Sequence, residues 1–264
     1  FAQDWFIENG DITISAGENG NNVTQGSTTK ENDTDTVIKG SSSNTVTIHA
    51  DEGKTVDVTL DNVNIDTSKT GEAAVSVTGK GDTNIELNGN NTLTSGSGHA
   101  GLEHNKTDTS GTLTITDNNN DGKLTANGGA GSAGIGGGFG NDGQAAITGG
   151  EITASGGSYG AGIGGGRNYN SAGGNGDVTI SGGKITAKGD DHAAGIGGGG
   201  DYSDPTNTGN GNVTISGGEI TATGGWLGSG IGGGTFGTGT VTISGGTIKD
   251  AQGGAGAAGI GGGS

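Results

Sequence analysis

Cysteine and methionine are absent from this 264-residue chain, and proline occurs once, at Pro205. The absence of cysteine excludes disulfides, thiol catalysis and cysteine-ligated metal sites. A single proline leaves nearly every backbone amide free to pair with a neighbouring strand. No run of about 18 apolar residues occurs, so the sequence predicts no membrane-spanning helix.

Positive charge and aromatic side chains are also scarce. The chain has 11 Lys and Arg against 28 Asp and Glu, which gives a formal net charge of -17, and Arg167 is its only arginine. Such a chain cannot neutralise a phosphate backbone, so we expect no nucleic-acid partner. Aromatic residues make up 3% of the chain, whereas glycine accounts for 66 residues. This composition is typical of disordered chains, but the order of the residues points elsewhere.

The segment "GIGGG" recurs at spacings of 28, 33, 35 and 29 residues, with its isoleucine at Ile135, Ile163, Ile196, Ile231 and Ile260. Regular self-similarity of this kind is typical of stacked repeats. Each repeat contains three short strands separated by glycine turns, as in "DVTISGG", "KITAKGD" and "AAGIGGG" over residues 177–199. Val178 and Ile180 alternate with polar residues, as expected of a strand with one buried face.

Less regular copies of the repeat precede these, and Val75 and Leu102 stand where the later isoleucines stand. We expect these two residues and the five isoleucines to form one inward column. The sequence therefore predicts an all-β fold, a single right-handed parallel β-helix (β-solenoid) of about eight to nine coils with glycine-rich turns. Residues 1–50 are predicted to form an N-terminal cap and the first irregular coils, and residues 51–264 the regular repeats of one continuous domain.

Several motifs carry a resemblance to a known family: "VTLDNVNID", "AAVSV", "NIELNGNNTLTSG", "GTLTIT", "EITASGG" and "AGIGGG". Over roughly residues 50–264 the chain resembles secreted parallel β-helix proteins of clostridia and related gut bacteria that are described as containing carbohydrate-binding domains. The resemblance implies a right-handed β-helix similar to that of pectate lyases, bound calcium and affinity for plant or other polysaccharides. It offers no short catalytic signature that could be carried over to residues of this chain.

Aromatic side chains recur at two places in the repeat. One column follows the isoleucine by four to six residues and holds Phe139, Tyr169, Tyr202 and Phe236. A second column precedes it by four or five residues and holds Tyr159, His192 and Trp226. In a solenoid such columns become ladders of rings that a sugar chain can stack on. We predict glycan contact here; packing of the rings against their own loops is the alternative.

The segment "DNNNDG" at 117–122 matches the first half of a calcium loop, with Asp117, Asn119 and Asp121 as oxygen ligands and Gly122 at the turn. The acidic residue that closes such a loop is missing, because Gly128 stands at its place. We predict Ca²⁺ as the one cofactor. The alternative is a metal-free Asn- and Asp-rich turn.

The favoured function is non-catalytic binding of an extracellular polysaccharide, or adhesion, by a protein that is secreted or held at the bacterial cell surface. Catalytic residues are expected to be absent, because no Lys recurs beside an acidic cluster as a polysaccharide lyase would need. A polysaccharide lyase and an ice-binding protein are minor alternatives. Ice binding rests on columns of outward hydroxyls that include Thr179, Thr214 and Thr242.

The main alternative is a structural surface protein whose molecules stack end to end into filaments. Phe1, Trp5 and Phe6 form the densest aromatic group of the chain. They are predicted either to cap their own first coil or to dock on the open C-terminal coil of a neighbour.

Overall fold

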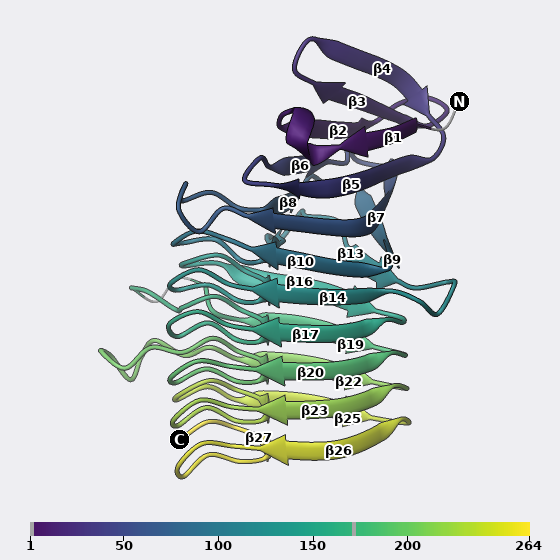
Figure 1. The fold of residues 1–264 in the computed structure, drawn as a ribbon. Coiled ribbons are helices and arrows are strands. Elements are labelled where there is room, and N and C mark those ends of the chain that lie inside the picture. Colours follow the sequence, from purple (N-terminus) through teal and green to yellow (C-terminus); the bar gives the residue numbers. More distant parts are fainter. Residues whose placement is uncertain (1–2, 171–172) are drawn as a thin grey trace.

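The chain winds into a right-handed parallel β-helix of about nine coils (Figure 1), seen in a computed structural model that describes residues 3–170 and 173–264. The coils are stacked along one axis, with the N-terminus at one end of the rod and the C-terminus at the other. The only helix in the described part is the single 3-10 turn η1 (Ile7–Asn9). The predicted fold class is confirmed.

Three faces of parallel strands run along the rod. The first face consists of β7 (Thr55–Asp66), β9 (Asp82–Asn88), β13 (Leu113–Thr116), β16 (Asp142–Ile147), β19 (Gly176–Ile180), β22 (Gly211–Ile215) and β25 (Gly239–Ile243). The second face consists of the end of β7, β10 (Asn90–Thr94), β14 (Lys123–Asn127), β17 (Glu151–Ser155), β20 (Lys184–Lys188), β23 (Glu219–Thr223) and β26 (Thr247–Gln252). The long strand β7 belongs to both and joins them into one sheet.

The third face is made of much shorter strands. It consists of β6 (Val46–His49), β8 (Val75–Thr78), β11 (Leu102–Glu103), β15 (Ile135–Gly136), β18 (Ile163–Gly164), β21 (Ile196–Gly197), β24 (Ile231–Gly232) and β27 (Ile260–Gly261). The two-residue strand β12 (Asn105–Lys106) pairs with β16 in antiparallel orientation. From β13 onward each coil therefore has three strands and three turns, as the repeat predicts.

The N-terminal end differs from the regular coils. Its strands are β1 (Gln3–Phe6), β2 (Ile12–Ala16), β3 (Asn21–Gln25), β4 (Thr28–Asp33) and β5 (Thr36–Ser42). Strands β2 and β5 join the parallel faces, but β3 and β4 fold back as antiparallel strands beside β2. The sequence did not predict these hairpins. The β3–β4 connection has two residues and places Gly26 at φ 58°, a conformation that favours tight hairpins.

The predicted inward column is confirmed residue by residue. Val75, Leu102, Ile135, Ile163, Ile196, Ile231 and Ile260 are successive partners in the third face. All but Ile260 are fully buried, and Ile12 and Val46 extend the column toward the N-terminal end. Val178 and Ile180 are likewise buried in β19 while Thr179 is exposed. Hydrophobic side chains thus fill the axis of the rod along its length.

The glycines of "GIGGG" allow coils to approach closely. Gly164 has φ 136°, and a Cβ at this position would overlap the carbonyl oxygen of Gly197 on the next coil. Only glycine satisfies both the backbone conformation and the contact. Ile163, beside it, points inward, so the segment combines one core side chain with a backbone that packs directly on its neighbours.

Candidate functional site

The aromatic side chains predicted to bind a glycan lie on the loops that flank the third face. Tyr159, His192 and Trp226 lie on the loops that enter its short strands, and Phe139, Tyr169, Tyr202 and Phe236 on the loops that leave them. The exposed fraction is 60% for Tyr202, 51% for Trp226 and 44% for Tyr169. Exposed apolar side chains that gather in one patch often mark a binding site, whereas single ones are common on any surface. We call this set of seven residues the aromatic edge.

The two columns of the aromatic edge merge instead of forming separate ladders. Ring centres are 5.2 Å apart for Phe139 and Tyr169, 5.4 Å for Tyr159 and His192, and 5.0 Å for His192 and Tyr202. The Trp226 ring lies 5.2 Å from His192 and 6.3 Å from Tyr202. These separations are those of favourable aromatic pairs. Phe236 is 40% exposed and contacts no other described ring.

His192 is at the centre of this cluster, and its predicted role needs correction. Its side chain is 5% exposed, and neither ring nitrogen has a hydrogen-bond partner among the described residues. Burial lowers its pKa below the ordinary value, although Asp191 and Asp201 act in the opposite direction. The sequence assigned His192 a direct glycan contact, but the rings of Tyr159, Tyr202 and Trp226 surround it. His192 therefore supports the exposed rings from within.

Arg167 connects the two parts of the cluster and was not predicted as a site residue. Its guanidinium carbon lies 4.5 Å from the centre of the Tyr159 ring, 5.6 Å from Tyr169 and 5.9 Å from Phe139. These are cation–π distances. The signal that could have pointed to Arg167 is its position two residues before Tyr169, as the one arginine of an acidic chain.

Asp201 anchors both Arg167 and the loop that carries Tyr202. The Arg167 Nη2 donates to the fully buried Asp201 carboxylate at 3.1 Å, and Asn207 donates to it at 2.7 Å. Burial alone would raise the pKa of Asp201, but hydrogen bonds from Asn207, Ser203 and Arg167 outweigh it and hold the pKa below its usual value. The carboxylate therefore stays ionised and fixes the guanidinium among the rings.

Three residues of the aromatic edge, Tyr159, His192 and Phe236, have strained backbone φ angles of 63°, 67° and 60°. For Tyr159 and His192 the repeat shows which residue they replace. In each coil, one position lies four residues before the residue of the inward column. In most coils this position holds a glycine with a left-handed backbone conformation, at Gly71, Gly98, Gly131 and Gly256. At the same place Tyr159 has φ 63°, His192 has φ 67° and Leu227 has φ 65°. Bulky residues rarely adopt this conformation, which costs on the order of 1–3 kcal/mol. Strain of this kind often accompanies a functional role.

The predicted calcium loop joins β13 to β14. Asp117 Oδ1 accepts hydrogen bonds from the backbone N–H groups of Asp121 at 3.2 Å and Gly122 at 3.1 Å, which closes the loop. Asn119 and Asp121 are exposed. The described residues contain no group of three or more His, Asp or Glu side chains arranged to hold a metal ion. Calcium binding at Asp117, Asn119 and Asp121 therefore stays a prediction.

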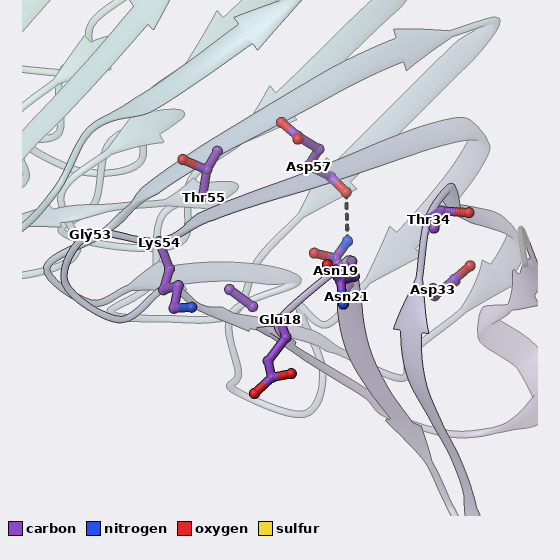
Figure 2. A pocket seen from close by; sticks show the side chains of 12 residues that line it. Glu18, Asn19, Asn21, Asp33, Thr34, Gly53, Lys54, Thr55 and Asp57 are labelled. Carbon is purple, nitrogen blue, oxygen red and sulfur yellow. Dashed lines mark hydrogen bonds between the residues drawn. The ribbon is translucent and has the colours of Figure 1, made fainter.

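A polar groove of about 330 Å³ lies between the N-terminal hairpins and the first regular coil. Figure 2 shows that the carboxylates of Glu18, Asp33 and Asp57 point in different directions there. Asn21 bridges the groove, because its Nδ2 donates to the Asp57 carbonyl at 2.7 Å and to Thr36 Oγ1 at 3.0 Å. These contacts attach the hairpins to the coil, and nothing in them indicates a ligand.

The aromatic N-terminal segment divides into parts with different environments. Trp5 is 2% exposed, and its Nε1 donates to Asp33 at 2.9 Å, so it packs in its own end of the rod and is not accessible to a neighbour. Phe6 is 47% exposed, and Phe1 lies outside the described residues. In the last coil of the chain, Ile243 and Ile260 are 41% and 44% exposed. End-to-end association through these residues stays a prediction.

The hydroxyl column that suggested ice binding is only partly continuous. Thr179, Thr214 and Thr242 are successive partners in the first face, but Ala146 stands between Thr114 and Thr179. The hydroxyl array is therefore interrupted in one coil.

The comparisons with known proteins agree with the fold. Five segments match the family model described as a beta helix repeat: residues 119–139, 146–167, 178–200, 213–235 and 241–264. The chain is thus a β-helix repeat protein. The clostridial carbohydrate-binding family that the motifs resemble is not identified by any of these matches. No curated protein and no solved structure matches the chain. No helix in the described residues is long and apolar enough to cross a membrane.

Proposed function

We propose that this β-helix repeat protein binds a neutral extracellular polysaccharide through its aromatic edge, without cleaving it. The observation that carries the proposal is the group of exposed rings on successive coils, which is supported from within by Tyr159 and His192. These two residues stand where other coils have glycine, at a cost in backbone strain. Coils repeat at about 4.8 Å, so the rings offer closely spaced stacking surfaces. A sugar chain that runs along the rod can contact several of them at once.

Charge favours an uncharged ligand. The chain carries a formal net charge of -17, which repels a polyanion. The guanidinium of Arg167 at the aromatic edge is already paired with Asp201. An acidic polysaccharide would need bridging cations, whereas a neutral one needs none.

Arg167 also supports a non-catalytic role. A polysaccharide lyase needs a Lys or Arg that is free to take a proton from the sugar. The only arginine here is held by a buried carboxylate and covered by three rings, so it is a poor candidate for that base.

Binding to insoluble polysaccharides tests this function. Replacing Tyr169 and Tyr202 together by Ala removes two exposed rings from the edge, and we expect binding of long chains to weaken by about 10-fold or more. Phe6→Ala is the matched control, because it removes an equally exposed ring at the N-terminal end of the rod. Equal binding by the double variant and the wild type, or no binding by the wild type, would contradict the proposal.

Calcium binding by the loop at 117–122 is a separate part of the proposal. Asp117, Asn119 and Asp121 would supply oxygens at about 2.3–2.6 Å. We expect added Ca²⁺ to raise the melting temperature by a few degrees, about 2–4 °C per kcal/mol of stabilisation, and a chelator to reverse the shift. Asp121→Ala should abolish the response, while Asp108→Ala, at another exposed turn, should leave it intact. Identical melting curves with Ca²⁺ and with chelator would refute the site.

A secreted or cell-surface location follows from the proposed ligand and belongs to the same proposal. Fractionation of the native host, with the chain detected by antibody, tests it directly. Detection only inside the cell would exclude an extracellular polysaccharide as the ligand.

A further inference from the structure

A groove with a volume of about 520 Å³ lies at one end of the aromatic edge. Phe139, Tyr159 and Arg167 are its large side chains, and the rest of the lining is serine, alanine and glycine. Sites for small molecules usually have volumes of about 300–1,000 Å³. Arg167 is the only charged residue in the lining, although the chain as a whole is strongly acidic.

The repeat explains how the groove forms. Gly98 and Gly131 occupy the left-handed position in two successive coils, and on the third coil the same position holds Tyr159. The Tyr159 ring therefore stands where the two preceding coils have no side chain, and it closes the groove. A Cβ on Gly131 would overlap the Phe139 ring, so this glycine lets Phe139 pack down as a second wall.

The chemistry of the groove is aromatic and hydrogen-bonding, with little net charge. Rings cover the guanidinium of Arg167, at 4.5 Å from Tyr159 and 5.9 Å from Phe139, so its N–H groups can donate only at the edge. One of these donates to Asp201 at 3.1 Å and offsets the positive charge. The side chain as a whole remains 26% exposed, whereas its Nε is buried and has no hydrogen-bond partner among the described residues.

We propose that this groove is the principal subsite of the aromatic edge and binds one neutral pyranose ring, an inference that rests on the proposed function. The C–H face of a pyranose packs on an aromatic ring, and its hydroxyl oxygens accept hydrogen bonds from the guanidinium edge. A uronic acid would need an unpaired cation, and Asp201 has already offset the one cation present. The sugar chain leaves the groove past Tyr169, whose ring is 5.2 Å from Phe139.

The single arginine allows a direct test in the full chain. With ¹⁵N labelling, the Arg167 Nε–H gives the only arginine side-chain signal in the NMR spectrum, and Arg167→Lys assigns it by its loss. The probes are neutral hexasaccharides of glucose, mannose, galactose or xylose, and a galacturonate hexasaccharide. We expect at least one neutral probe to shift the signal in a saturable way and the acidic probe to shift it less. A larger response to the acidic probe would overturn the neutral assignment.

Tyr159→Gly is the decisive variant, because glycine occupies this position in four other coils and the fold should be retained. We expect at least a 10-fold loss of affinity for the neutral probe, with an unchanged melting temperature or a higher one. If polysaccharide binding depends on Tyr202 but not on Tyr159, and the Arg167 signal does not move, the subsite is wrong and the proposed function stands. If the wild type binds no probe and no polysaccharide, both fail.

Discussion

The coils of residues 55–106 and those of residues 142–234 use the same three faces but fill them differently. In the second face, one inward column begins with Ile65 and Leu93 and continues with alanine in every later coil, at Ala126, Ala154, Ala187, Ala222 and Ala251. The turn between the first two faces changes as well. Asn62 and Asn91 accept backbone N–H groups through their side chains, whereas later coils turn through paired glycines such as Gly182 and Gly183.

This difference shows what the glycine-rich coils achieve. Small inward side chains and glycine turns allow successive coils to be nearly identical, so loops of one coil lie in register with those of the next. The three most exposed rings of the aromatic edge, Tyr169, Tyr202 and Trp226, occur in these coils. Tyr159 and His192 occupy the left-handed position here, whereas Gly71 and Gly98 occupy it in the earlier coils. Regular backbone stacking is thus the scaffold on which the rings form a cluster.

The largest effect is expected from a charge in the inward column that both regions share. Ile196→Asp buries an unpaired carboxylate in a fully enclosed position, and we expect a loss of more than about 4 kcal/mol or failure to fold. Ile260→Asp, at the 44% exposed end of the same column, should cost far less. Chemical denaturation measures both. Similar losses at the two positions would mean that enclosure does not determine stability here.

Substitutions that exchange large and small inward side chains between the earlier and later coils of the second face test the comparison directly. Leu93→Ala should leave a cavity in the earlier coils and cost about 2–5 kcal/mol. Ala187→Leu adds volume to a fully packed later coil and should cost about 1–3 kcal/mol; both residues are at most 1% exposed. Denaturant midpoints give the two values. A neutral Ala187→Leu would show that the later coils have spare interior volume.

Two buried histidines, one in each region, predict a loss of stability in acid. Burial lowers the pKa of both His104 and His192 below 6.5. As pH falls through about 6.5 the unfolded chain takes up protons that the folded chain does not, so stability is present above this pH and decreases toward the folded pKa. Each unit of lowering corresponds to about 1.4 kcal/mol.

The histidines can be separated by substitution. His104→Gln and His192→Gln should each flatten the acid side of the stability profile, measured by denaturation between pH 8 and 4. Only His192→Gln should also remove the pH dependence of Trp226 fluorescence, because the two rings are 5.2 Å apart. An unchanged profile in both variants would show that the carboxylates alone account for acid sensitivity.

The smallest effect concerns the left-handed position itself. Gly98 has φ 85° and open space where a Cβ would lie, so Gly98→Ala isolates backbone strain. We expect a loss of about 1–2 kcal/mol, visible in thermal melting. No loss would mean that Tyr159 and His192 occupy their positions without cost, which removes strain as support for their functional role.

Much of the fold could be predicted because the pairing of each coil with the next follows directly from the spacing of the repeats along the chain. The spacing of the isoleucines identified the inward column of the third face. The alternation of apolar and polar residues around Val178 identified the buried side of strand β19 in the first face. The hairpins of β3 and β4 were missed, because a single Gly26 turn does not distinguish an extra antiparallel strand from one more irregular coil. The aromatic residues were found as two columns, but their merger and the position of Arg167 were not.

The amino-acid sequence by itself determined the β-helix, its repeat and the inward column. The reason is that equivalent apolar residues at regular spacing can all be buried only when successive repeats stack on one another. The tertiary structure alone decided which side chains meet across the loops. Residues 159, 167, 192 and 202 belong to different loops, and their distances depend on how the loops on either side of the short third-face strands fold against each other. Burial of His192 and pairing of Arg167 with Asp201 follow from that packing, which no spacing along the chain encodes.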